Sequence, residues 1–170
     1  MIILGIDPGI NSVGYGVIYF HNHNSIDYLA SGLVKTSTFK PLHFRLAIII
    51  HQIEEIINNF KPNLIGMEEV FVNNNVFSSI KLCHARGAIM SVIGKLNYPL
   101  KEMSPNLVKK TITGIGHSDK NQVLSMVKLT LKNPELKISL DESDALAVAC
   151  TAGIFYKYDS LKKTSESITT

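Results

Sequence analysis

Residues 1–20, MIILGIDPGINSVGYGVIYF, contain a short apolar run that ends at a single acidic residue. Residues 2–6 are apolar and are followed by Asp7 and a turn sequence, which predicts a buried β-strand that stops sharply. Residues 13–20 are rich in valine, isoleucine and aromatic side chains and predict a second strand. Taken alone, Asp7 would be interpreted as a turn residue. A carboxylate at the tip of a buried strand is nevertheless costly unless it is paired or binds a metal ion, so Asp7 is a candidate site residue.

From these two strands outward, the hydrophobic pattern predicts one α/β domain with a mixed five-stranded sheet. Short turns join the first three strands, which favours antiparallel pairing, whereas a later strand–helix–strand step favours a parallel partner for the first strand. We expect one domain over residues 1–157 and a polar, disordered tail over residues 158–170. The remaining expected elements are strands at 26–36, 64–68 and 100–103, and helices at 41–60, 77–96, 105–113, 121–132 and 141–156.

Composition limits the class of protein. The chain has 170 residues, of which 45% are apolar and 18% charged, as expected for one folded globular domain. Its net charge of +3 arises from the residues after Gly94, which is a mild indication of a polyanionic partner. Cys83 and Cys150 lie in apolar helical patterns and are expected to be buried free thiols. Because the N-terminus lacks signal-peptide features and no apolar run is long enough to cross a membrane, we expect a cytoplasmic location.

A second acid, Glu68, ends the apolar run of residues 64–68. The carboxyl ends of parallel strands are the ligand-binding edge of open α/β sheets. If this strand lies parallel to the first one, Glu68 and Asp7 lie side by side. Glu69 follows at once and points to the opposite face, because strand side chains alternate. We therefore assign Glu68 rather than Glu69 to the candidate site.

Two further acids, Asp141 and Asp144, begin the last predicted helix at a spacing of three residues, which places them on one helical face. Acids in the first turn interact favourably with the helix dipole, so capping alone is an open interpretation of this pair. Capping needs only one such residue, however, and Glu142 between them is expected to face solvent. The apolar residues that follow place this face against the core, where two acids need counter-charge.

The expected strand order brings all four acids to one edge of the sheet. Four carboxylates do not converge without cations to neutralise them, and hard oxygen ligands suit Mg²⁺, with Mn²⁺ as a substitute. Two such ions about 3.5–4 Å apart form the clamp used in phosphoryl transfer, where one activates water and the other stabilises the leaving oxygen. The sequence therefore predicts a metal-dependent nuclease with two ions in each active site.

The segments ILGIDPGINSVGYGVI, MEEVF, VKKTITGIG and DESDALAVA resemble, in order and spacing, those of the RuvC family of Holliday-junction resolvases. The resemblance extends from the first residue to about Tyr156. It implies the ribonuclease H-like fold and a homodimer that uses Mg²⁺ to nick two opposing strands of a four-way DNA junction symmetrically. It also implies a branch-migration complex as a partner. The residues that match the family's catalytic acids are Asp7, Glu68, Asp141 and Asp144, although some members carry histidine at the position of Asp141.

Three more residues match positions that the family places near DNA. Phe71 follows Glu68 by three residues; an exposed Phe there can stack on an unpaired base, and the alternative is a side chain packed in the core or in a dimer interface. Lys109 and Lys120 taken alone are interpreted as solvated lysines, and beside four acids their best role is to bind backbone phosphate. Small residues in the helix at 77–96 make that helix a candidate dimer interface.

Two other functions remain open from sequence: a ribonuclease H-like nuclease that acts on RNA or another nucleic acid, and a binding module without catalysis. The loop at 71–76 and the basic segment from Lys109 to Lys120 favour the resolvase. The intact set of four acids argues against a pure binding module, which has no reason to hold acids facing a polyanion. An actin-like ATPase begins with a similar strand and turn, but this chain is too short for the two lobes of that class.

Overall fold

The fold was obtained as a computed structural model, which describes the backbone of residues 1–70 and 76–167 and the side chains of residues 1–70 and 77–156. Five strands form one mixed sheet in the order β3-β2-β1-β4-β5. Strands β1, β2 and β3 pair antiparallel, whereas β4 is parallel to β1 and β5 is parallel to β4. This arrangement confirms the predicted α/β class and strand pairing. The strands are β1 (Ile2–Asp7), β2 (Ser12–Asn22), β3 (Ser25–Lys35), β4 (Leu64–Glu68) and β5 (Leu100–Met103).

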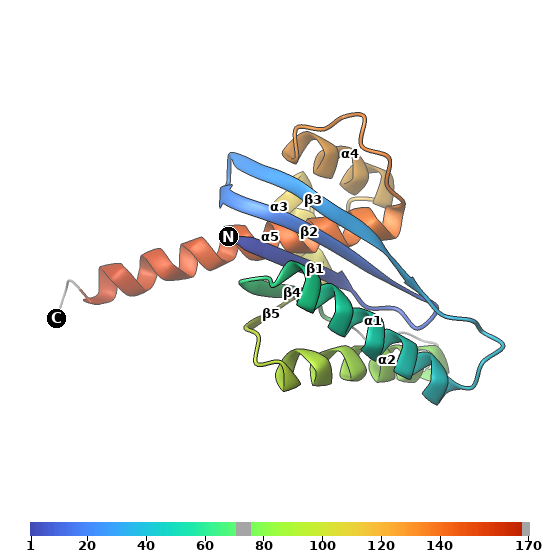
Figure 1. The fold of residues 1–170 in the computed structure, drawn as a ribbon. Coiled ribbons are helices and arrows are strands. Elements are labelled where there is room, and N and C mark those ends of the chain that lie inside the picture. The colour runs from blue at the N-terminus through green and yellow to red at the C-terminus, as the bar shows by residue number, and fades with distance from the viewer. Residues whose placement is uncertain (71–75, 168–170) are drawn as a thin grey trace.

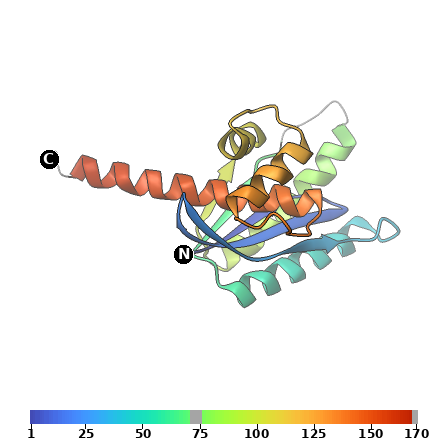
Figure 2. The same cartoon turned by 90° about the horizontal axis from the view of Figure 1, so that it is seen from above.

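Among the described residues, five helices cover the two faces of this sheet (Figures 1 and 2). Helices α1 and α2 pack on one face around an apolar core that includes Ile49, Ile53 and Ile89. The other three helices pack on the opposite face around a second core that includes Val127 and Leu146. The helices are α1 (Leu42–Phe60), α2 (Val76–Lys95), α3 (Pro105–Thr113), α4 (Lys120–Thr130) and α5 (Leu140–Ser167).

Helix α5 lies unusually close to the sheet, because glycines face it where other residues would carry side chains. A Cβ atom added to Gly5 of β1 would lie 2.1 Å from the carbonyl oxygen of Ala145, and one added to Gly14 of β2 would lie 2.4 Å from that of Asp141. Gly14 is also the β2 partner of Asp7. The glycines interleaved in the first two strands therefore bring the start of α5 directly over the end of β1.

Two sequence expectations need correction. Helix α5 continues to Ser167, beyond the predicted end near Tyr156, and its later turns project past the sheet (Figure 1). The domain boundary at residue 157 stays a prediction. Cys150 is a buried free cysteine as predicted, but Cys83 is exposed on α2, so its predicted burial was wrong. Within the described residues, no helix has the length and apolar character needed to cross a membrane.

Candidate active site

Two of the four predicted acids end neighbouring parallel strands. Asp7 is the last residue of β1 and Glu68 is the last residue of β4. The register pairs Ile6 with Met67, so the next position on each strand is one of these acids. The strand-end argument from sequence thus places both carboxylates at the same edge of the sheet.

The start of α5 is capped by residues other than the two predicted acids. The Ser139 hydroxyl accepts a hydrogen bond from the backbone N–H of Glu142 (3.3 Å), and the Glu142 carboxylate accepts one from the backbone N–H of Ser139 (2.8 Å). This reciprocal pair is a capping box. Glu142, which was expected to face solvent, is half-buried and caps the helix. The capping interpretation of Asp141 and Asp144 fails for the same reason, and both carboxylates are free for other interactions.

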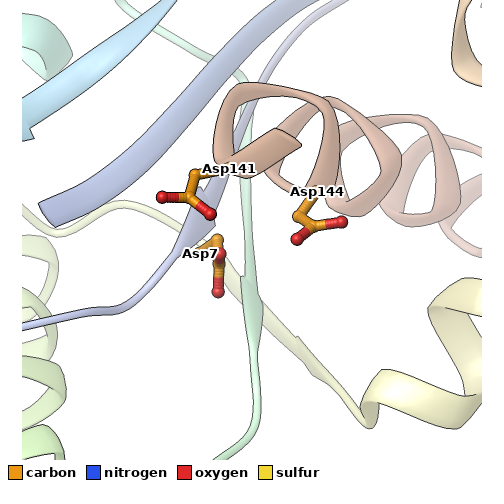
Figure 3. Close-up of side chains that lie close together, drawn as sticks. All are labelled: Asp7, Asp141 and Asp144. Carbon is orange, nitrogen blue, oxygen red and sulfur yellow. The ribbon is translucent and has the colours of Figure 1, made fainter. Parts of the chain in front are cut away.

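Three carboxylates from β1 and α5 converge in space. Each of Asp7, Asp141 and Asp144 offers an oxygen, and these oxygens all lie within 4.8 Å of one another. Figure 3 shows the Asp7 side chain close to Asp141 and Asp144, which lie at the start of the α5 helix. Glu68 joins Asp7 and Asp144 in lining a cavity of about 180 Å³. The structure thus brings all four predicted acids to one place, three of them in a tight group.

Both predicted lysines line the same cavity. The Lys120 Nζ lies 2.8 Å from Asp144 Oδ2 and 3.2 Å from Asp141 Oδ1. Burial lowers the pKa of Lys120, but the hydrogen bond and charge of Asp144, followed by those of Asp141, more than offset this and raise it above its ordinary value. The positive charge of Lys109 lowers the pKa of Glu68, but burial and the charge of Asp144 outweigh this effect. Phe71, the third predicted DNA contact, lies outside the described residues.

Burial and mutual repulsion keep two of the acids from ionising easily. Burial, followed by the charges of Glu68 and Asp144, raises the pKa of Asp7 to about 8. Burial, followed by the charge of Asp144, raises the pKa of Glu68 to about 7 despite the two lysines. Perturbed carboxylates of this kind are typical of functional sites, because a folded protein otherwise avoids concentrating like charges.

The chemistry of the donor set fits divalent cations of the hard class. All four groups are carboxylates, which suit Mg²⁺ and Mn²⁺, and no thiolate or imidazole lines the cavity among the described residues. Two lysines alone do not balance four acids, and the pKa values of Asp7 and Glu68 are raised first by burial and then by the charges of the neighbouring acids. A bound divalent cation would supply the missing positive charge.

Sequence reasoning missed a residue that supports this edge. Arg45 on α1 is buried, and its guanidinium donates to the Ile10 carbonyl (2.8 Å) and the Asn11 side chain (2.5 Å) in the turn that follows Asp7. It also donates to the Thr36 hydroxyl (3.0 Å). The signal was present in the sequence, because Arg45 interrupts the apolar face of a predicted helix.

A mixed sheet with acids at the ends of two central strands and on a helix packed across them defines the ribonuclease H-like class. The model of the family "Crossover junction endodeoxyribonuclease RuvC" matches residues 3–152. The protein of that name from Rickettsia africae is 46% identical over 158 residues, which cover 93% of this chain and all of that protein. The chain belongs to the RuvC family of crossover junction endodeoxyribonucleases.

Solved structures agree with this assignment. The structure titled "T. thermophilus RuvC in complex with Holliday junction substrate" superposes with a TM-score of 0.87 at 30% identity, covering 94% of this chain and 96% of that one. The yeast mitochondrial Holliday junction resolvase Ydc2 superposes with a TM-score of 0.63 at 16% identity over 95% of this chain and 85% of that one, a likeness that concerns the fold alone. The predicted ribonuclease H-like fold and family are confirmed.

Proposed function

We propose that this endonuclease resolves four-way DNA junctions by paired nicks in opposing strands, hydrolysing phosphodiesters with Mg²⁺ at Asp7, Glu68, Asp141 and Asp144. The observation that carries the proposal is the convergence of acids from two strands and one helix in a cavity that two lysines also line. The similarity to a protein solved with a Holliday junction supports the choice of substrate. The reaction takes place in the cytoplasm, with Mn²⁺ as a substitute metal.

In this proposal the four acids bind the metal ions and the two lysines bind the DNA. The four carboxylates would hold two cations, and such ions, when bound, would supply an activated water and stabilisation of the leaving oxygen. Asp7, Asp141 and Asp144 provide the tight group of oxygens, and Glu68 adds a fourth carboxylate from β4. Asp7 and Glu68 release their protons when a cation binds, because their raised pKa values keep them partly protonated near neutral pH. Lys109 and Lys120 bind the backbone phosphates beside the bond that is cut.

The direct test compares a synthetic four-way junction with a linear duplex of matched sequence, each incubated with and without Mg²⁺. Paired nicks at symmetric positions, in the junction alone and only with metal, are the expected result. Junction binding without cleavage would indicate a binding module. Cleavage of an RNA-containing duplex in preference to the junction would favour the RNA-processing alternative.

Phe71 is proposed to contact unpaired bases at the branch point, on the strength of the family resemblance. We expect Phe71→Ala to slow junction cleavage roughly 10-fold, because stacking on one base contributes about 1–3 kcal/mol. The melting temperature should stay close to that of the wild type. A large fall in melting temperature would instead identify Phe71 as a core residue.

A homodimer through α2 is proposed, because paired nicks need two active sites. Gly87 and Gly94 lie on the exposed surface of this helix, and a Cβ atom at either position would meet nothing within 4 Å. Phe77 near the start of the same helix is 81% exposed. Ala85, another small residue of this helix, is buried in the protomer's own core and therefore lies outside the proposed interface. A branch-migration complex is the further partner that the family implies.

We expect Gly87→Glu to convert the dimer into monomers in sedimentation experiments, because two bulky like charges would meet near the dimer axis. Paired nicking should then fall while the protomer stays folded, since the new side chain enters open space in its own chain. Gly87→Ala is the matched control and should remain dimeric, with a slight gain in helix stability. A Gly87→Glu protein that stays dimeric would move the interface away from α2.

A further inference from the structure

Glu142 uses both of its carboxylate oxygens within the protein. Its Oε2 accepts hydrogen bonds from the backbone N–H (2.8 Å) and the hydroxyl (2.7 Å) of Ser139. Its Oε1 accepts a hydrogen bond from the hydroxyl of Ser31 (2.9 Å), which lies 111 residues away in the chain. Burial opposes ionisation, but the bonds from Ser139 and Ser31 lower the pKa of Glu142 below its ordinary value. The Glu142 carboxylate therefore ties Ser139, just before α5, to Ser31.

The far end of this tie is the outermost strand on one side of the sheet. Ser31 lies in β3 opposite Gly16 of β2, and its hydroxyl also lies 3.1 Å from the hydroxyl of Tyr28. The glycines of β1 and β2 allow α5 to lie close to the sheet, but a glycine offers no side chain to hold it there. Buried side chains later in α5, such as Leu146, hold the helix against the sheet, and Glu142 joins its first turn to β3.

The first turn of α5 determines where the Asp141 carboxylate lies. Asp141 immediately precedes Glu142, and its side chain is 44% exposed, compared with 17% for Asp144. Lys120 Nζ, 3.2 Å from Asp141 Oδ1, helps to orient this carboxylate, but so much of the side chain lies in solvent that packing contributes little to its position. Its location beside Asp7 therefore depends on the backbone of this turn, which the capping box and the Ser31 hydrogen bond fix.

We propose that Glu142 is a positioning residue for the metal site: by tying the start of α5 to β3, it holds Asp141 in register with Asp7 and Asp144 and so strengthens divalent-cation binding. Glu142 itself does not bind the cation, because Ser139 and Ser31 occupy both of its oxygens. The proposal rests on the metal site described under the proposed function. It adds a requirement that lies outside the four acids.

The test measures Mn²⁺ binding by titration calorimetry in the full-length protein without DNA. We expect Glu142→Ala to weaken binding roughly 10-fold, in line with the loss of residues that orient metal ligands. Glu142→Gln should retain most of the affinity, because glutamine also completes a capping box, as Gln122 does with Asp119 in α4. Ser31→Ala removes only the β3 end of the tie and should weaken binding by a smaller factor. Amide hydrogen exchange at residues 140–143 should quicken in Glu142→Ala.

A stability control separates positioning from general weakening of the fold. Ile53→Val lowers stability through the core on the opposite face of the sheet and should leave Mn²⁺ affinity unchanged. If Glu142→Ala binds Mn²⁺ as tightly as the wild type, the positioning role is overturned. If Glu142→Ala does not fold, an unchanged affinity in Ser31→Ala overturns it equally. Failure of the wild type itself to bind Mn²⁺ would instead reject the underlying metal site.

Discussion

Replacing Asp7 with asparagine should abolish junction cleavage while leaving junction binding intact. Asp7 belongs to the tight group with Asp141 and Asp144, and asparagine offers one neutral oxygen where the carboxylate offers a charged one. Loss of the stabilisation that a metal ion gives to the transition state raises the activation free energy by several kcal/mol. An increase of about 4 kcal/mol corresponds to roughly a 1,000-fold fall in rate. The measurement is single-turnover cleavage of a labelled junction in Mg²⁺.

Binding of the junction should survive this substitution for an electrostatic reason. Because the pKa of Asp7 is raised to about 8, its metal-free side chain is already largely neutral at pH 7, and Asp7→Asn leaves Lys109 and Lys120 in the same cavity. Gel-shift titration in the absence of metal should therefore give an affinity at least equal to that of the wild type. Rapid cleavage by Asp7→Asn would reject the assignment of the metal site.

A matched pair of variants at the end of β4 tests the choice between adjacent acids. Glu68→Gln should lose cleavage as Asp7→Asn does, because Glu68 lines the cavity that Asp144 and both lysines share. Glu69→Gln makes the same change of charge one residue later and should keep cleavage within about 3-fold of the wild type, a difference of under 1 kcal/mol. If Glu69→Gln lost cleavage and Glu68→Gln kept it, Glu69 and not Glu68 would be the acid that belongs to the active site.

The sequence was sufficient for the strand-end acids, because strand alternation and short connections are local rules. Strands β4 and β5 begin and end where the apolar runs predicted, and the parallel pairing of β1 with β4 follows from the connection through a helix. The meeting of α5 with β1 was harder to foresee. It depends on glycines in two strands that leave room for the helix backbone, and a glycine in a strand has several possible meanings.

Two structural features have a signal in the sequence that the sequence analysis did not use: the capping box of α5 and the buried Arg45. Ser139 and Glu142 have the Ser-x-x-Glu spacing of a capping box, which would have released Asp141 and Asp144 from the capping interpretation. Arg45 stands on an otherwise apolar helix face, where a buried cation needs several acceptors. The acceptors lie in the turn after Asp7, and only the folded arrangement identifies them.

Metal binding by this protein should depend steeply on pH between about 6 and 8. The pKa of Asp7 is raised to about 8 and that of Glu68 to about 7, so both acids are largely protonated at pH 6. A cation binds their ionised forms and must displace up to two protons at the lower pH. With these pKa values, the affinity for Mn²⁺ should rise roughly 500-fold from pH 6 to pH 8 when both carboxylates bind the ion. Calorimetry in buffers of different ionisation enthalpy measures both the affinity and the number of protons released.

The same pKa shift fixes the sign of the stability change in the absence of metal. The folded protein retains a proton on Asp7 that the unfolded chain loses above its ordinary pKa of 3.8. Protonation therefore favours the folded state fully below about pH 4, and this contribution is lost as the pH rises through about 8. Melting temperatures measured in a chelator should fall across this window, and added Mn²⁺ should reverse the fall at pH 8.

Asp7→Asn isolates the contribution of this carboxyl from every other titrating group. Asparagine is neutral at all pH values, so the variant should gain stability over the wild type progressively from pH 4 to pH 8 in chelator and then maintain a constant difference. Mn²⁺ should narrow that difference, because it stabilises the wild-type site more than the variant site. A stability difference that does not change with pH would mean that Asp7 ionises normally, so that neither burial nor the neighbouring carboxylates hold a proton on it.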